Sequence, residues 1–595
     1  MSPSLPHFVG ARPRDAATTE FCVWAPLHER VDLYLVDTRE SMPLEPCEGG
    51  YFALATERAT AGTDYYFVLD GDHLPDPASK FQPAGVQGPT QVVDLRSYSW
   101  ADADYRPRAL WEHVIYELHV GAFSESGTFE GALEYLDGLV DLGISAIEVM
   151  PIAQFSGERN WGYDGVFPFS VQSSYGGPRQ FQHFVDECHQ RGLAVILDVV
   201  YNHLGPEGDV LERYAPFFTD RYRTPWGHAL NYDGPHSDDV RHYFWLTARQ
   251  WFVDYHVDAL RLDAVDSIVD NTATPFLSQL AARTHSLSEE LGRPCELIAE
   301  SAANDPRLVT PLEEGGIGMD AQWNDDFHHA LHVALTGERV GYYEDYTGVE
   351  DIERTLNEGF ALQDQWSPFR QRHHGAPSRQ VPPDRFVVFA QNHDQVGNRP
   401  SSDRLSTTLS DQQLRLVAAL VLLSPNIPLL FMGEEYGETA PFPFFVDYSD
   451  PELIEAVRSG RAHEFAGFGD FRDTLDPVAP STFAEAKLRR SLLEKPAHRE
   501  LLGHYQSLID LRRSVPALGR ASRSNVTSWT EGNVLALWRT HEQGDALAFF
   551  NLSAHAAPLA PPSSRQWREL SGSPLSGAAF DVEPWGYCLL LSEAQ

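Results

Sequence analysis

The chain has 595 residues, of which 42% are hydrophobic and 12% aromatic, so it can bury more than one core, and wholesale disorder is excluded. Its formal charge is −40, from 45 basic and 85 acidic residues. Such a charge repels nucleic-acid backbones and anionic membranes, so we expect neither as a partner; a neutral or cationic partner fits better.

The cysteines and the apolar stretches bear on location and assembly. The five cysteines lie far apart with no CxxC pair, which argues against a disulfide framework and a thiolate metal site. The N-terminal segment MSPSLPHFVGARPRD lacks the apolar core of a signal peptide, and the most apolar stretch, 416–423, is too short to span a bilayer. We therefore expect a cytoplasmic protein, with a monomer as the default state.

Residues 1–100 show the alternation of β-strands. Phe21, Val23 and Ala25 alternate with other residues, and an aromatic run follows at 65–67. Glycine and proline separate these runs. The pattern predicts an N-terminal β-sandwich of the kind found in carbohydrate-binding modules.

Residues 101–495 show the rhythm of repeated β/α units. Because no Gly-rich phosphate loop follows the first strand, a closed (β/α)8 TIM barrel is favoured over a doubly wound open sheet. The eight expected strands are VIYELHV (114–120), AIEVMP (146–151), LAVILDVV (193–200), VDALRLDAVD (257–266), ELIAE (296–300), MDAQW (319–323), FVVFAQNH (386–393) and PLLFMGEE (428–435).

The segment between the first and second expected strands has an apolar stripe. Phe129, Leu133, Leu136 and Val140 fall on one face of an expected helix, with Gly143 as its C-cap. The stripe predicts a single amphipathic helix.

Residues 496–595 return to β-structure. Apolar runs at 534–539, 546–553 and 587–592 are separated by Gly, Pro and Ser. We expect a small antiparallel C-terminal domain.

Polar residues gather where the expected barrel strands end, and in a barrel those ends converge on one mouth. Retaining glycoside hydrolysis needs a carboxylate nucleophile about 5–5.5 Å from a carboxylic acid. Arg261 lies two residues before Asp263 on the same strand face and would keep it ionised. The residues at these ends are Asp198, Asn202, His203, Arg261, Asp263, Glu300, Asn392, His393, Asp394, Glu434 and Glu435.

Four segments in this region, DVVYNH, RLDAVD, IAE and NHD, resemble in order and spacing four motifs of the α-amylase superfamily, glycoside hydrolase family 13. The resemblance implies Asp263 as nucleophile, Glu300 as acid/base and Asp394 as transition-state stabiliser. One departure is Asp266, where the superfamily often has His or Lys. The resemblance also implies contacts with the sugar or the nucleophile from Tyr163, His203, Arg261 and His393.

Further segments resemble one subgroup of that family, the malto-oligosyltrehalose trehalohydrolases. They are WNDDFHHALHVALTGE (323–338), QNHDQVGNR (391–399) and PFPFFVDYSDPELIEAVRSGR (441–461). The resemblance implies hydrolysis of the α-1,4 bond between a terminal trehalose and a malto-oligosaccharide, with no cofactor. A branching enzyme, a general α-amylase, a debranching enzyme and a non-catalytic glucan-binding protein are the alternatives.

Several residues have more than one interpretation. We expect Trp323 and Glu434 to bind substrate, although Trp323 also suits packing and Glu434 a solvated loop. The histidine pairs at 328–329 and 373–374 suit a cleft lining or plain exposure better than metal ligation. Asn202 matches a calcium-binding position of some amylases, but the other oxygen ligands cannot be found, so no metal is assigned. Trp161, Trp226 and Phe327 suit either sugar stacking or packing.

Overall fold

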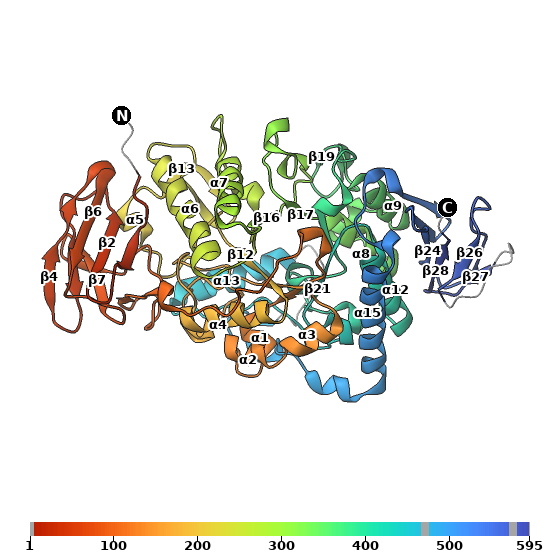
Figure 1. The fold of residues 1–595 in the computed structure, drawn as a ribbon, viewed down its shortest axis with the longest axis horizontal. Coiled ribbons are helices and arrows are strands. Elements are labelled where there is room, and N and C mark those ends of the chain that lie inside the picture. Colours follow the sequence, from red (N-terminus) through yellow and green to blue (C-terminus); the bar gives the residue numbers. More distant parts are fainter. Residues whose placement is uncertain (1–4, 466–474, 571–579, 594–595) are drawn as a thin grey trace.

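The computed structural model describes residues 5–465, 475–570 and 580–593. Two groups of antiparallel sheets lie at opposite ends of the long axis, and a closed parallel barrel with its helices lies between them (Figure 1). In the described part of the chain, no helix is long and apolar enough to cross a membrane.

The N-terminal sheets pack face to face through aromatic rings. Phe21 on β2 meets Tyr65 and Phe67 on β7 edge-on, with ring centroids 5.0 and 6.5 Å apart. One sheet has the order β1 (Gly10–Pro13), β2 (Thr19–Trp24), β6 (Tyr51–Thr56), β5 (Glu45–Pro46). The other has the order β4 (Glu40–Pro43), β3 (Asp32–Leu35), β7 (Asp64–Leu69), β8 (Asp72–Leu74), with β9 (Thr90–Gln91) also paired to β7.

The eight expected barrel strands all form, and they close into one parallel barrel in chain order. The TIM-barrel fold class is therefore confirmed. The strands are almost wholly buried, which explains their continuous apolar sequences. They are β10 (Ile115–Leu118), β11 (Ala146–Val149), β12 (Ala194–Val199), β15 (Ala259–Leu262), β16 (Glu296–Ala299), β17 (Ala321–Trp323), β20 (Phe386–Phe389) and β21 (Ile427–Phe431).

The predicted apolar stripe is divided between two helices of the first crossover, so the prediction of one continuous helix was wrong. Helix α2 (Phe129–Leu133) ends before Tyr135, and α3 (Leu136–Leu142) begins after it. The break turns the apolar face, and Val140 is 37% exposed instead of buried. Gly143 does cap α3 in the left-handed conformation, as predicted, with φ 101°.

The remaining helices surround the barrel. Their buried stripes match the 3.6-residue period of surface helices. The longer ones are α4 (Gly177–Gln190), α6 (Ser237–Asp254), α7 (Phe276–Leu291), α8 (Asp325–Thr336), α9 (Val349–Glu358), α12 (Asp411–Leu423), α13 (Pro451–Phe465) and α15 (Pro496–Ser514). The short ones are α1 (Val120–Phe123), α5 (Leu211–Tyr214), α10 (His393–Gly397), α11 (Leu405–Thr408) and α14 (Pro480–Glu485).

Small sheets complete the chain. A hairpin of β13 (Phe218–Thr224) and β14 (Gly227–Leu230) lies between β12 and α6, and a second hairpin pairs β18 (Gln365–Ser367) with β19 (Arg372–His374). The C-terminal sheet has the order β22 (Val526–Glu531), β23 (Val534–Arg539), β24 (Ala546–Asn551), β28 (Tyr587–Ser592), β26 (Trp567–Glu569). Beside it, β25 (Ala557–Leu559) pairs with β27 (Phe580–Val582).

The domain limits 1–100, 101–495 and 496–595 stay a prediction. Helix α15 begins at the last of these limits but packs on α3 and α12 of the barrel layer (Figure 1). We propose that the C-terminal domain begins after this helix, near residue 515.

Candidate active site

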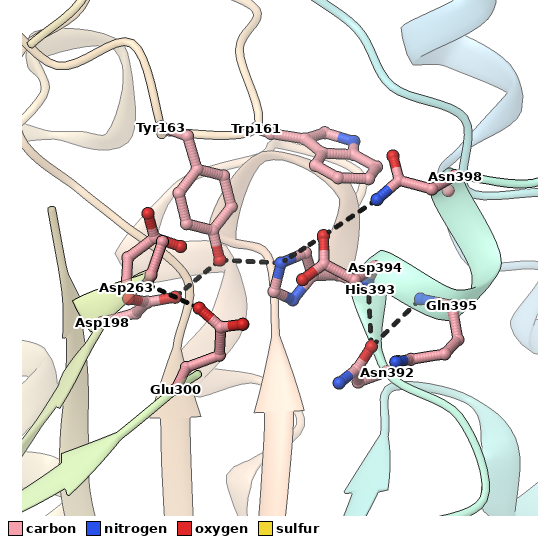
Figure 2. A network of polar contacts seen from close by, with 12 residues as sticks. Trp161, Tyr163, Asp198, Asp263, Glu300, Asn392, His393, Asp394, Gln395 and Asn398 are labelled. Carbon is pink, nitrogen blue, oxygen red and sulfur yellow. Dashed lines mark hydrogen bonds and ion pairs between the residues drawn. The ribbon is translucent and has the colours of Figure 1, made fainter. Parts of the chain in front are cut away.

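The three expected catalytic carboxylates lie around one opening at the carboxyl ends of the barrel strands. Asp263 directly follows β15, Glu300 directly follows β16, and Asp394 lies in the first turn of α10 after β20. Figure 2 shows Asp263 and Glu300 on one side of this opening and Asp394 on the other. Side chains distant in the sequence are thus brought together as the strand order predicts.

Arg261 organises the nucleophile side of the opening. Its guanidinium is fully buried, and Nη1 donates to both oxygens of Asp198 at 2.9 Å and to Oδ1 of Asp263 at 3.0 Å. Asn202 donates to Oδ2 of Asp263 at 2.7 Å. These bonds hold the Asp263 carboxylate in place through both of its oxygens.

Glu300 is joined to the residue that follows the nucleophile. The backbone N–H of Ala264 donates to Oε2 of Glu300 at 2.5 Å. Ala264 is left-handed, with φ 39°, a strained conformation of the sort that clusters at functional sites. Burial raises the pKa of Glu300 well above its ordinary value, and the carboxylates of Asp263 and Asp394 raise it further, while Arg261 opposes them. Glu300 is therefore suited to carry a proton.

His393 and Tyr163 line the wall of the opening (Figure 2). The two rings stack with centroids 5.1 Å apart, and Nε2 of His393 lies 2.8 Å from the Tyr163 hydroxyl. The hydroxyl donates to Oδ2 of Asp198 at 2.6 Å. Burial lowers the pKa of His393, but Asp394 and Glu117 outweigh it and raise that pKa to about 9.

Asp394 is held by hydrogen bonds with the side chains of the two residues that cap α10, Asn398 and Asn392. The side chain of Asn398 donates to Oδ1 at 3.2 Å, and the Asn392 side chain caps the helix by accepting the backbone N–H of Asp394 at 3.0 Å. The Asp394 carboxylate is 36% exposed, so one edge stays open to a ligand.

His203 lies beneath an exposed tryptophan. Its Nε2 bonds the carbonyl of Tyr163 at 3.0 Å, and Trp226 of the β13–β14 hairpin stacks on its ring with centroids 4.5 Å apart. Trp226 is 48% exposed, so its outer face is open. Of the two interpretations of Trp226, the structure favours a surface that a sugar can reach.

Two predicted substrate-binding residues do not face the opening. Trp323 is 1% exposed, and its ring packs under the Arg261 guanidinium, 4.3 Å from the ring centroid. Glu434 is buried, and its Oε1 accepts the hydroxyl of Tyr505 on α15 at 3.0 Å. Both side chains are packed inward, and direct sugar contact from these two residues stays a prediction.

Two acidic residues of the site were not predicted. Asp325 follows the sixth strand, and the rule of polar strand ends would have found it had it been applied to that strand. Burial and then the nearby Asp394 raise its pKa to about 7, and Gln395 donates to it at 3.2 Å. Glu117 lies inside β10 and bonds His393; an acidic residue within a buried strand was the signal.

The histidines of the two predicted pairs differ in burial. His328 and His329 are buried against Tyr343 and Tyr346, which replaces both the cleft lining and the exposure that we expected. His373 is largely exposed on β19, as predicted. Within the described ranges, no three His, Cys, Asp or Glu side chains form a group that could hold a metal ion.

Comparisons with known proteins agree with this geometry. Residues 97–224 match the family model "Alpha amylase, catalytic domain". The malto-oligosyltrehalose trehalohydrolase of Arthrobacter ramosus is 46% identical over 501 residues, which cover 83% of this chain and 87% of that protein. This chain belongs to the malto-oligosyltrehalose trehalohydrolase family.

Two further matches extend this result. The family member from Saccharolobus solfataricus is 43% identical, covering 83% of this chain and 85% of that protein. A crystal structure from Salmonella typhimurium, provisionally named an alpha amylase, superposes with a TM-score of 0.90 at 38% identity, covering 98% of this chain and 99% of that chain. That structure therefore matches the terminal sheets of this chain as well as its barrel.

Proposed function

We propose that this chain is a retaining glycoside hydrolase that releases trehalose from malto-oligosyltrehalose by cleaving the α-1,4 bond next to the trehalose. The observation that carries the proposal is the pairing of Asp263, whose carboxylate Arg261 and Asn202 hold, with the partly buried Glu300, whose pKa is raised. The substrate follows from the names of relatives 43–46% identical to the chain.

The proposed mechanism is a double displacement. Asp263 attacks the anomeric carbon while Glu300 protonates the oxygen of the departing trehalose, which gives a glycosyl-enzyme intermediate. Glu300, now ionised, takes a proton from water, which attacks the same carbon and releases the shortened malto-oligosaccharide. Asp394 binds ring hydroxyls, and its carboxylate stabilises the positive charge of the oxocarbenium-like transition state, while His393 lies beside it in the wall of the opening.

This chemistry uses side chains alone, and we propose that no organic cofactor takes part. A cytoplasmic location and a monomeric state stay predictions from the sequence.

The test is product analysis on two substrates. Maltotriosyltrehalose and maltopentaose are incubated separately with the purified protein, and the released sugars are separated. Rapid release of trehalose from the first, with slow cleavage of the second, is expected. Equal cleavage of both would mean a general amylase, and branched or lengthened products would mean a transferase. Failure to cleave either substrate would favour the alternative of a non-catalytic glucan-binding protein.

A further inference from the structure

His393 is held from the interior of the barrel by a residue outside the family motifs quoted above. Glu117 is the third of the four residues of β10 and is 1% exposed. Its Oε1 lies 2.5 Å from Nδ1 of His393, and its Oε2 accepts the backbone N–H of the same residue at 3.1 Å. One carboxylate thus fixes both the ring and the backbone of His393.

The protonation of Nε2 of His393 follows from the hydrogen-bond donors around Asp198 and the Tyr163 hydroxyl. Nη1 of Arg261 donates to both oxygens of Asp198, so Asp198 is an acceptor only. Tyr163 therefore gives its single hydroxyl proton to Asp198, and its oxygen is left to accept from His393. Nε2 of His393 must then carry a proton.

The remaining nitrogen, Nδ1, faces Glu117. Asp394 lies only 3.4 Å from Nε2, so two carboxylates flank one ring, and both stabilise its cationic form. The raised pKa of His393 agrees with this arrangement. The titratable groups around the ring are Glu117, His119, Glu148, Asp198, Arg261 and Asp394, in addition to the Tyr163 hydroxyl.

We propose that Glu117 is a positioning residue that holds His393 as a doubly protonated imidazolium, with Nε2–H directed at Tyr163 and the opening. The inference deepens the proposed function and rests on it for the catalytic consequence. A cationic His393 balances the charge of Asp394, and its Nε2–H orients the Tyr163 hydroxyl beside the opening. Glu117 acts through His393 and does not touch the substrate.

The neighbouring strand supplies a matched control. Glu148 on β11 is the direct register partner of Glu117 and is equally buried. Neither of its carboxyl oxygens has a hydrogen-bond partner in the described part of the chain, and burial raises its pKa well above the ordinary value. Because burial favours the neutral form of Glu148, we expect its replacement by glutamine to change no charge.

The first test is the pH profile of kcat/KM for Glu117→Gln and Glu148→Gln. Loss of a hydrogen bond to a charged group predicts a fall of roughly ten- to a hundredfold for Glu117→Gln at pH 8. The loss should shrink toward pH 5.5, since acid restores the imidazolium. Glu148→Gln should stay within about twofold of the parent, because a neutral side chain replaces a neutral one. A pH-independent loss, or an equal loss in both variants, would overturn the proposal.

The second test needs no variant and no activity, so it separates this inference from the proposed function. Neutron diffraction from a deuterated crystal of the full chain at pD 7 locates the exchangeable protons. Deuterium on both Nδ1 and Nε2 of His393 is expected. Deuterium on Glu117 or on only one ring nitrogen would overturn the proposal, whatever reaction the protein catalyses.

Discussion

Glutamates follow both the fifth and the eighth barrel strands, and both have raised pKa values, yet their surroundings differ. Glu300 shares its space with Asp263, Asp394 and the Arg261 guanidinium, and it borders the opening. Glu434 accepts the hydroxyl of Tyr505, and burial raises its pKa to about 7. A carboxyl group at a strand end is therefore not catalytic by position alone; the charges and the space beside it decide its role.

The largest loss of activity is expected for Glu300→Gln, which has no counterpart at Glu434. The amide cannot give a proton to the departing oxygen, so kcat on maltotriosyltrehalose should fall by about 10²–10⁴-fold. Asp263→Ala should be at least as severe, since it removes the nucleophile. Far-UV circular dichroism should match the parent for both. Substantial turnover by either variant would refute the role given to that residue.

A second prediction concerns Asp325, the acidic residue after the sixth strand that we did not predict from the sequence. Above pH 7 the ionised Asp325 raises the pKa of Glu300 through charge repulsion. Asp325→Asn removes that charge, so Glu300 loses its proton at lower pH, and the basic limb of the kcat profile should move to lower pH by about half a unit. The profile of the parent, recorded under the same conditions, serves as the control. An unchanged basic limb would mean that Asp325 and Glu300 are not coupled.

The smallest effect on activity is expected for Glu434→Gln. Since this side chain bonds Tyr505 and does not face the opening, kcat should stay within about twofold of the parent. A large loss would restore Glu434 as a substrate-binding residue.

The same variant should differ from the parent in the pH dependence of stability. The folded-state pKa of Glu434 is raised, so the stability that it contributes is present below its ordinary pKa and is lost as pH rises through 7. Glu434→Gln lacks this loss of stability, which is worth about 3 kcal/mol. Calorimetry should find the variant more stable than the parent at pH 8, with a smaller difference at pH 5. An equal difference at both values would contradict the buried, protonated form.

All eight barrel strands could be located from the sequence, because strands buried on both faces need continuous apolar runs. The sequence also placed Asp263, Glu300 and Asp394 together, since the ends of parallel strands meet at one mouth. The limits of this reasoning are visible at Val140 and Trp323. A helical stripe does not reveal a break at Tyr135, and aromatic character does not distinguish a sugar platform from a ring packed under an arginine.

By itself, then, the sequence determined the barrel, its order and the residue types at its mouth, because these depend on local periodicity and on the chain order of strands. Only the tertiary structure decided which carboxylates face the opening, which are neutral, and that Glu117 holds His393. Those properties depend on burial and on the nearest charges, which residues up to 276 positions apart supply. Proximity of this kind arises from closure of the barrel, and no local pattern encodes it.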